Sequence, residues 1–209
     1  MNVSWRYILQ QDSDSNKGER ILEAAARLMR HKSFKEISMD ELAAEAKVAK
    51  GTLYLYFRSK GEIYLSLLIE KVTSFSEVVR EVKAKKWRSA KEALEEVLKA
   101  SLSAFAEKPR SKEIPIFALA GVTPDEIEDD LNRHFFPLVE ELKVNLSSIF
   151  KSGIDSREFR KLDPMKLAGL FLHLLEYCYV HSLLISDTPS DPSLEMAFVK
   201  DILFKGIMA

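Results

Sequence analysis

The stretch SMDELAAEAKVAKGTLYLYFRSK, residues 38–60, predicts two short helices joined by a tight turn. Ser38 begins the first helix with a capping box. The second helix is expected at about residues 50–57, where Leu53 and Phe57, four positions apart, lie on one buried face. This arrangement is typical of a helix-turn-helix, in which the second helix enters the major groove of DNA and the first braces it across the backbone.

Basic and hydroxyl side chains accompany this motif. Between residues 46 and 61 there is no acidic residue, and the basic residues are Lys47, Lys50, Arg58 and Lys60. Lysines and hydroxyl groups are common contacts to DNA phosphates. In the alternative interpretation, Tyr54 and Tyr56, which lie between these basic residues, belong to the core of a helical bundle, and the lysines are merely solvated.

The near-neutral charge of the whole chain does not exclude a nucleic-acid partner. The chain has 31 basic and 32 acidic residues, which gives a net charge of −1. Residues 1–60 carry 11 basic residues against 8 acidic ones, whereas residues 61–209 carry 20 against 24. The excess of positive charge is therefore in the part of the chain that contains the predicted motif, and the rest of the chain is acidic.

Residues 48–60, VAKGTLYLYFRSK, resemble the recognition-helix signature of the tetracycline-repressor (TetR) family of bacterial transcriptional regulators. Residues 18–51, GERILEAAARLMRHKSFKEISMDELAAEAKVAKG, resemble the rest of that family's DNA-binding domain. The resemblance covers about a quarter of the chain. It implies an all-α protein of about nine helices, with an N-terminal three-helix helix-turn-helix domain and a larger C-terminal helical domain for ligand binding and dimerisation.

The resemblance also implies which residues contact DNA. Thr52 and Tyr56 would bind phosphates, and Tyr54 would lie against a sugar or a thymine methyl group. Lys60 would hold a phosphate from the start of the next helix. The complete predicted set is Ser38, Lys47, Lys50, Gly51, Thr52, Tyr54, Leu55, Tyr56 and Lys60.

Two positions depart from the family pattern. Lys47 occupies the turn position where the family often has glycine, and Ala49 replaces a frequent serine. A turn with positive φ would cost a lysine more than a glycine, although the lysine could add a phosphate contact.

The helical pattern defines the predicted domains. We expect a loose tail over residues 1–15, a DNA-binding domain over 16–60 and a ligand-binding and dimerisation domain over 61–209. Pro137 is expected to kink a long helix that Gly153 ends. The predicted helices cover residues 16–31, 38–46, 50–57, 60–85, 89–107, 115–121, 125–152, 163–185 and 194–207.

The C-terminal region is rich in aromatic residues, and the resemblance implies an effector pocket there. Pockets are mostly apolar and contain a few polar groups that orient the ligand. The predicted lining residues are Phe105, Phe117, Phe135, His134, His173 and Tyr177. Each of these aromatic residues could instead be part of the core.

The helix predicted near residues 163–185 is apolar on nearly all sides, so it must be covered on both sides. Self-association into a homodimer explains this economically, and burial within one chain is the alternative. The predicted interface residues are Leu167, Leu170, Phe171, Leu174, Cys178, Phe198 and Ile202.

No motif points to an enzyme, a metal site or a cofactor. Glycine-rich phosphate loops, CxxC, HExxH and G-x-S-x-G are absent from the sequence. No secretory signal is recognisable, and the apolar stretch 165–185 contains four ionisable residues, so we expect no membrane span. The single cysteine, Cys178, fits a cytoplasmic protein.

These observations together predict a cytoplasmic, homodimeric regulator of transcription that binds double-stranded DNA at a palindromic operator. A small and largely apolar effector would release it, with the helix at 60–85 as the lever, and repression is implied by the resemblance. The alternative is an all-helical carrier of small molecules without sequence-specific DNA binding.

Overall fold

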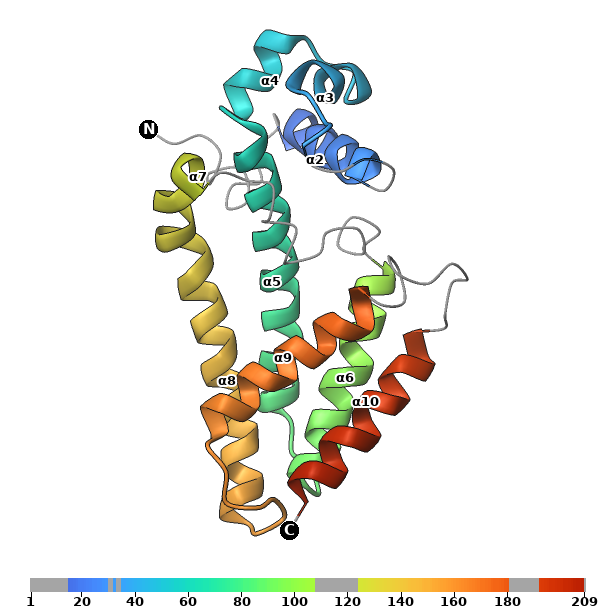
Figure 1. The fold of residues 1–209 in the computed structure, drawn as a ribbon, viewed down its shortest axis with the longest axis vertical. Helices are drawn as coiled ribbons and strands as arrows, with labels where there is room; N and C mark the ends of the chain where they lie inside the picture. The colour runs from blue at the N-terminus through green and yellow to red at the C-terminus, as the bar shows by residue number, and fades with distance from the viewer. Residues whose placement is uncertain (1–14, 30–31, 33–34, 108–123, 181–191, 209) are drawn as a thin grey trace. The chain divides into compact units, whose positions relative to one another are not determined.

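The computed structural model describes residues 15–29, 32, 35–107, 124–180 and 192–208 (Figure 1). Within these ranges the chain is built from helices, and its only strand-like pairing is an isolated bridge between Phe159 and Met208. The predicted all-α class is confirmed. No helix in the described ranges is both long and apolar enough to cross a membrane.

Three helices build the predicted helix-turn-helix region. They are α2 (Ser15–Met29), α3 (Met39–Glu45) and α4 (Lys50–Tyr56), and all three pack against one another. Their shared core contains Ile21 of α2, Leu42 of α3 and Leu53 of α4, all of which are buried. The capping residue of α3 is Ser38, whose Oγ accepts a hydrogen bond from the Glu41 N–H at 3.2 Å, as the sequence predicts.

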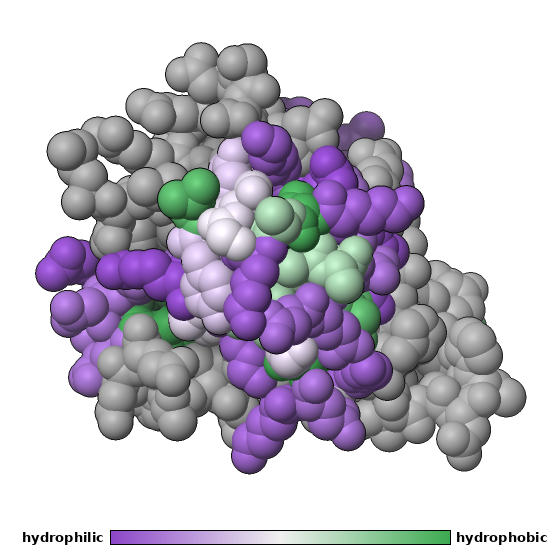
Figure 2. Space-filling model, turned by 90° about the horizontal axis from the view of Figure 1, so that it is seen from above, coloured by the Kyte–Doolittle hydropathy of each residue, from purple (hydrophilic) through white to green (hydrophobic). Residues whose placement is uncertain are grey.

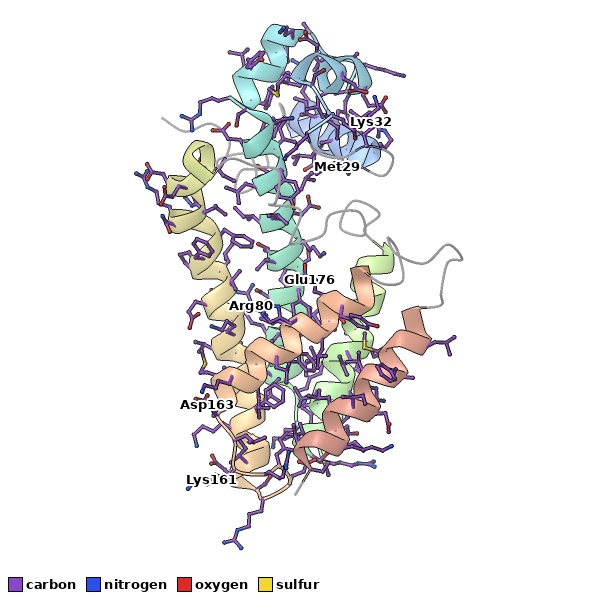
Figure 3. The ribbon with its side chains drawn as sticks, in the orientation of Figure 1. Met29, Lys32, Arg80, Lys161, Asp163 and Glu176 are labelled. Carbon is purple, nitrogen blue, oxygen red and sulfur yellow. The ribbon has the colours of Figure 1, made fainter. Side chains whose placement is uncertain are left out.

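The remaining helices follow along the chain. They are α5 (Lys60–Ala84), α6 (Ala90–Glu107), α7 (Pro124–Asp130), the π-helical turn η3 (Leu131–Phe135), α8 (Phe136–Asp155), α9 (Pro164–Val180) and α10 (Pro192–Ile207). Asp163 caps α9, because its Oδ1 accepts hydrogen bonds from the Met165 and Lys166 N–H groups (Figure 3). The helix predicted at residues 115–121 lies outside the described residues.

The packing divides the chain into two compact units. The first comprises Met1–Lys71 with Pro109–Pro137, and the second comprises Val72–Lys108 with Leu138–Ala209. The first unit therefore holds the described α7 and η3 together with the helix-turn-helix region. The predicted division into domains at residues 60 and 61 concerns function and stays a prediction.

Aromatic rings form the core of the second unit. Phe150 of α8 makes an edge-to-face contact with Phe171 of α9, with ring centroids 5.8 Å apart, and lies 6.2 Å from Phe159. Glu158, in the connection between α8 and α9, accepts hydrogen bonds from the first N–H groups of α6, at Ala90 and Lys91. These contacts fix the connection against the start of α6.

The structure corrects two details of the long predicted helix. The irregularity near Pro137 is a π-helical turn, in which the Phe136 N–H bonds to the Leu131 carbonyl five residues earlier. Proline lacks the N–H that would continue the regular ladder at this point. Gly153 does not end the helix: α8 continues to Asp155, and Gly153 is buried because the ring of Phe159 packs directly on it.

We predict that Gly153→Ala destabilises the second unit. A Cβ at residue 153 would lie 2.3 Å from the Phe159 ring and 2.9 Å from the Ala90 Cβ. Overpacking of this kind costs about 1–3 kcal/mol, measurable by urea denaturation. The matched control is Gly169→Ala in α9, where no atom lies within 4 Å of the added Cβ. This control should gain about 0.5–1 kcal/mol of stability, so equal losses in both variants would contradict the interpretation.

Candidate nucleic-acid interface

The turn between α3 and α4 sets the direction of the second helix. Lys47 has φ 54°, in the left-handed region, so the structure confirms that a lysine holds a position suited to glycine. The Lys47 N–H bonds to the Ala44 carbonyl and the Val48 N–H to the Ala43 carbonyl, each at 3.0 Å. This pattern is a Schellman motif, which ends α3 sharply.

Arg20 of α2 completes this turn. One of its guanidinium nitrogens donates to the Ala46 carbonyl at 2.7 Å and to the Lys47 carbonyl at 2.8 Å. Both carbonyls lie at the end of α3, where no backbone N–H follows in the helical ladder. The arginine therefore ties α2 to the turn, a contact that local sequence patterns do not reveal, because the two partners are 26 and 27 residues apart.

The helix α4 presents one face to the core and another to solvent. Leu53 and Phe57 are buried, as predicted. Lys50, Gly51, Tyr54 and Leu55 are exposed, and Leu55 is 72% exposed. Around Gly51 a Cβ would meet no atom within 4 Å, so the backbone is open to a close approach by another molecule.

The other predicted contact residues differ in their exposure. Thr52 and Tyr56 are half-buried, whereas Lys47 and Ser38 are exposed. The end of the molecule that carries α3 and α4 in Figure 1 is seen from above in Figure 2, where most of the coloured surface is hydrophilic around a small hydrophobic area. The contacts of these residues with DNA stay predictions.

Two of the predicted lysines already bind groups within the protein. The Lys50 ammonium forms an ion pair with Asp40 at 2.6 Å, and both side chains are exposed. The hydrogen bond to this carboxylate raises the pKa of Lys50. The Lys60 ammonium donates to the carbonyls of Ile37 at 3.0 Å and Lys35 at 3.2 Å, so it stabilises the connection before α3 in addition to any phosphate contact.

Basic residues on α2 and just after it are neutralised by acids of α3. Arg27 pairs with Glu45 at 2.7 Å, and Lys32 pairs with Glu41 at 2.5 Å (Figure 3). The same hydrogen bond from Lys32 to Glu41 raises the pKa of the lysine. Three acids of α3, Asp40, Glu41 and Glu45, therefore balance positive charge both on the α2 side and on α4.

The predicted pocket residues that the structure describes belong to two different units, and their role as a pocket stays a prediction. Phe135 and His134 belong to the first unit, where the Phe135 ring packs against Phe136. His173 and Tyr177 lie on the outer side of α9 in the second unit and are exposed. Phe117 and the side chain of Phe105 lie outside the described residues.

A groove of about 890 Å³ lies elsewhere, between α6 and α10 of the second unit. Its walls carry charges of both signs, including an ion pair between Lys200 and Glu95 at 3.1 Å. Lys91 lies 5.5 Å from the centre of the Phe204 ring in the same groove. Of the predicted pocket residues, the four with described side chains, His134, Phe135, His173 and Tyr177, do not line it.

The structure divides the predicted interface residues into two groups. Leu167 and Phe171 are buried within the second unit, so covering them requires no partner. Leu170 of α9 and Phe198 and Ile202 of α10 are each about half exposed, at 49%, 59% and 54%. Leu174 is half-buried, and the side chain of Cys178 lies outside the described residues. The sequence pattern does not separate the two groups, because it does not show which side of α9 the rest of the unit covers.

Metal binding has no candidate in the ranges that the structure describes. There, no group of three or more histidine, cysteine, aspartate or glutamate side chains is placed to hold an ion.

Comparisons with known proteins agree with this geometry. Residues 21–67 match the model of the N-terminal domain of bacterial regulatory proteins of the tetR family. The chain is similar to the fatty acid metabolism regulator protein of Bacillus subtilis, with 29% identity over 151 residues that cover 71% of this chain and 73% of the relative.

Solved structures show the same fold. The transcriptional regulator FadR of Bacillus subtilis in complex with stearoyl-CoA has a TM-score of 0.72 at 25% identity, covering 90% of this chain and 98% of that one. The MbdR regulator of Azoarcus sp. CIB has a TM-score of 0.74 at 19% identity, covering 92% of this chain and all of that one.

We predict that two substitutions at residue 47 separate its backbone role from its charge. Lys47→Gly and Lys47→Ala remove the same ammonium group, but only glycine relieves the left-handed conformation. The free energy of unfolding should therefore be about 1 kcal/mol higher for the glycine variant than for the alanine variant, as measured by urea denaturation. If Lys47 binds a phosphate, both substitutions should reduce the slope of log K for DNA binding against log salt by about one. Equal stability of the two variants would show that the turn relaxes.

Proposed function

The chain belongs to the tetR family of bacterial regulatory proteins, and on this premise we propose that it is a homodimeric repressor released from its operator by a long-chain acyl-CoA. The exposed face of α4 is the observation that carries the DNA-binding part of this proposal. Lys50, Gly51 and Leu55 are accessible on a helix whose opposite side is locked into the core by Leu53. A helix held in this way can enter a major groove without unfolding.

Contacts on this face divide into positioning and reading of sequence. Lys47, Lys50 and the hydroxyl groups of Thr52 and Tyr56 are suited to phosphates, which fix the register of the protein on DNA. Tyr54 and Leu55 present apolar surface that can contact a thymine methyl group. Asp40 must release Lys50, or share it, when a phosphate approaches, which lowers affinity for DNA of any sequence.

A second copy of the chain is the proposed cover for the exposed apolar side chains of α9 and α10. These two helices pack against each other, and Leu170, Phe198 and Ile202 remain about half exposed on them. Two copies related by a two-fold axis would bury these side chains. The dimer would present two α4 helices to half-sites about 34–36 Å apart, and the operator would then be palindromic.

The effector class is proposed from the relatives. The structure of the Bacillus subtilis FadR regulator contains stearoyl-CoA, and the relative that matches 71% of this chain is a regulator of fatty acid metabolism. A long acyl chain is the type of apolar group that a helical domain with an aromatic core can enclose. Such a ligand can release DNA only if it binds one conformation more tightly than the conformation that fits the operator.

We predict that Lys50→Ala weakens binding to the operator without unfolding the protein. The operator is first obtained by selecting bound duplexes from random DNA. Loss of one phosphate contact should weaken binding similarly for all sequences and reduce the slope of log K against log salt by about one.

The matched control is Lys161→Ala in the connection between α8 and α9, another exposed lysine, which is on neither helix of the proposed interface. This variant should bind like the wild type. A wild-type protein that enriches no duplex, and shows no salt-dependent binding, would favour a carrier of small molecules over a regulator.

We predict that stearoyl-CoA weakens operator binding at least about fivefold, the lower end of typical coupling between two sites. Coenzyme A alone and stearate alone should have smaller effects, because each lacks one part of the ligand. Fluorescence anisotropy of a labelled operator measures all three. If stearoyl-CoA leaves the affinity unchanged, the effector class is wrong, while DNA binding by α4 is unaffected.

A further inference from the structure

Two buried carboxylates converge on one arginine directly after the recognition helix. Arg58 lies between α4 and α5, and its guanidinium is 2.6 Å from the Glu62 carboxylate and 4.0 Å from that of Asp130. The Arg58 side chain is 67% exposed, whereas those of Glu62 and Asp130 are 4% and 9% exposed. Burial of a carboxylate is unfavourable unless it is paired, so the arginine stabilises both acids.

Glu62 fixes the backbone at the end of α4. Its carboxylate accepts hydrogen bonds from the Arg58 backbone N–H at 2.7 Å and from the Arg58 Nε at 2.6 Å. Ser59 caps the start of α5 by accepting from the Glu62 N–H at 3.2 Å. The backbone of residues 58–62 is therefore held by charge-assisted bonds, and the position of Arg58 is coupled to the end of the recognition helix.

Asp130 comes from a different part of the chain. It is the last residue of α7, and the π-helical turn Leu131–Phe135 follows it. In that turn the Phe136 N–H bonds to Leu131, so a return to the regular α-helical ladder would shift the hydrogen-bonding register by one residue and turn Asp130 about the helix axis. The contact of Asp130 with Arg58 is sensitive to such a change, because 4.0 Å is the outer limit of an ion pair.

We propose that Asp130 is a positioning residue for DNA binding: through Arg58 it couples the state of α7 to the orientation of the recognition helix α4. This inference rests on the proposed function, because it concerns regulation of the same DNA-binding face. Its basis is the meeting of α7 and the α4–α5 connection at one guanidinium. When Arg58 pairs with Glu62 and Asp130 together, α4 and α7 move as one body, and when Asp130 turns away, Arg58 keeps its pairing with Glu62 but the coupling of α4 to α7 is lost.

The test measures hydrogen exchange of residues 124–135 in the free protein and in complex with a duplex selected from random DNA. In the wild type, we expect operator binding to slow exchange in this segment about fivefold or more, the size of a modest coupling. In Asp130→Asn this slowing should fall below about twofold. Asp130→Glu, which keeps the charge, should restore part of it.

The control is Asp129→Asn on the same turn of α7. The Asp129 side chain is 89% exposed and lies 3.7 Å from Arg133. This variant should retain the wild-type response. If Asp130→Asn does not fold, Arg58→Gln tests the same pair from the exposed side and should also abolish the response.

The outcomes separate the two proposals. A wild type that binds no duplex overturns the proposed function and this inference with it. A wild type that binds a duplex, together with an Asp130→Asn variant that binds it and retains the slowing, overturns the inference alone. Lower thermal stability of Asp130→Asn with an unchanged exchange response would assign Asp130 a purely structural role and also overturn the inference.

Discussion

The left-handed turn at Lys47 is the constraint on which the helix-turn-helix depends. It ends α3 with a Schellman motif. The carbonyls of Ala46 and Lys47 accept no hydrogen bond within this motif, and Arg20 donates to both of them. The angle between α3 and α4 is therefore set by backbone hydrogen bonds and by one side chain of α2. Because Leu53 and Phe57 then anchor α4 in the core, the accessible side of α4 is determined as well. Which residues of α4 are exposed is thus a consequence of how the turn is stabilised.

Much of the fold and of the candidate interface could be predicted from the sequence, because both depend on local patterns. Capping by Ser38, the ends of α3 and α4, and burial of Leu53 follow from spacing and from capping chemistry over a few residues. The strained conformation of Lys47 also follows from its position in the motif. The hydrogen bonds from Arg20 to the turn and the ion pair of Arg58 with Asp130 join residues far apart in the sequence. The periodicity of the sequence therefore does not predict them.

The number of charges in a stretch of sequence does not show which of them are paired, because the partners can lie far apart in the sequence. The excess of positive charge in residues 1–60 includes Arg27 and Lys32, whose charges are balanced by Glu45 and Glu41 across the α2–α3 contact. Ion pairs between exposed groups contribute little to stability, about 0–1 kcal/mol, but they change which cations face an approaching anion. Lys50 on α4 is paired with Asp40 in the same way, so acids of α3 balance positive charge on α4 as well as on α2.

The sequence is also insufficient to predict which side of each C-terminal helix is buried within the chain. A helix that is apolar all round must be covered on all sides. Its sequence does not show which side is covered by the same chain and which by a second chain. Phe171, which packs against Phe150 of α8, and Leu167 are buried, whereas Leu170, Phe198 and Ile202 remain about half exposed. Tertiary packing thus reduces the predicted interface residues that still lack cover to a smaller set on α9 and α10. In the proposed dimer these side chains would be buried and would contribute hydrophobic free energy to association.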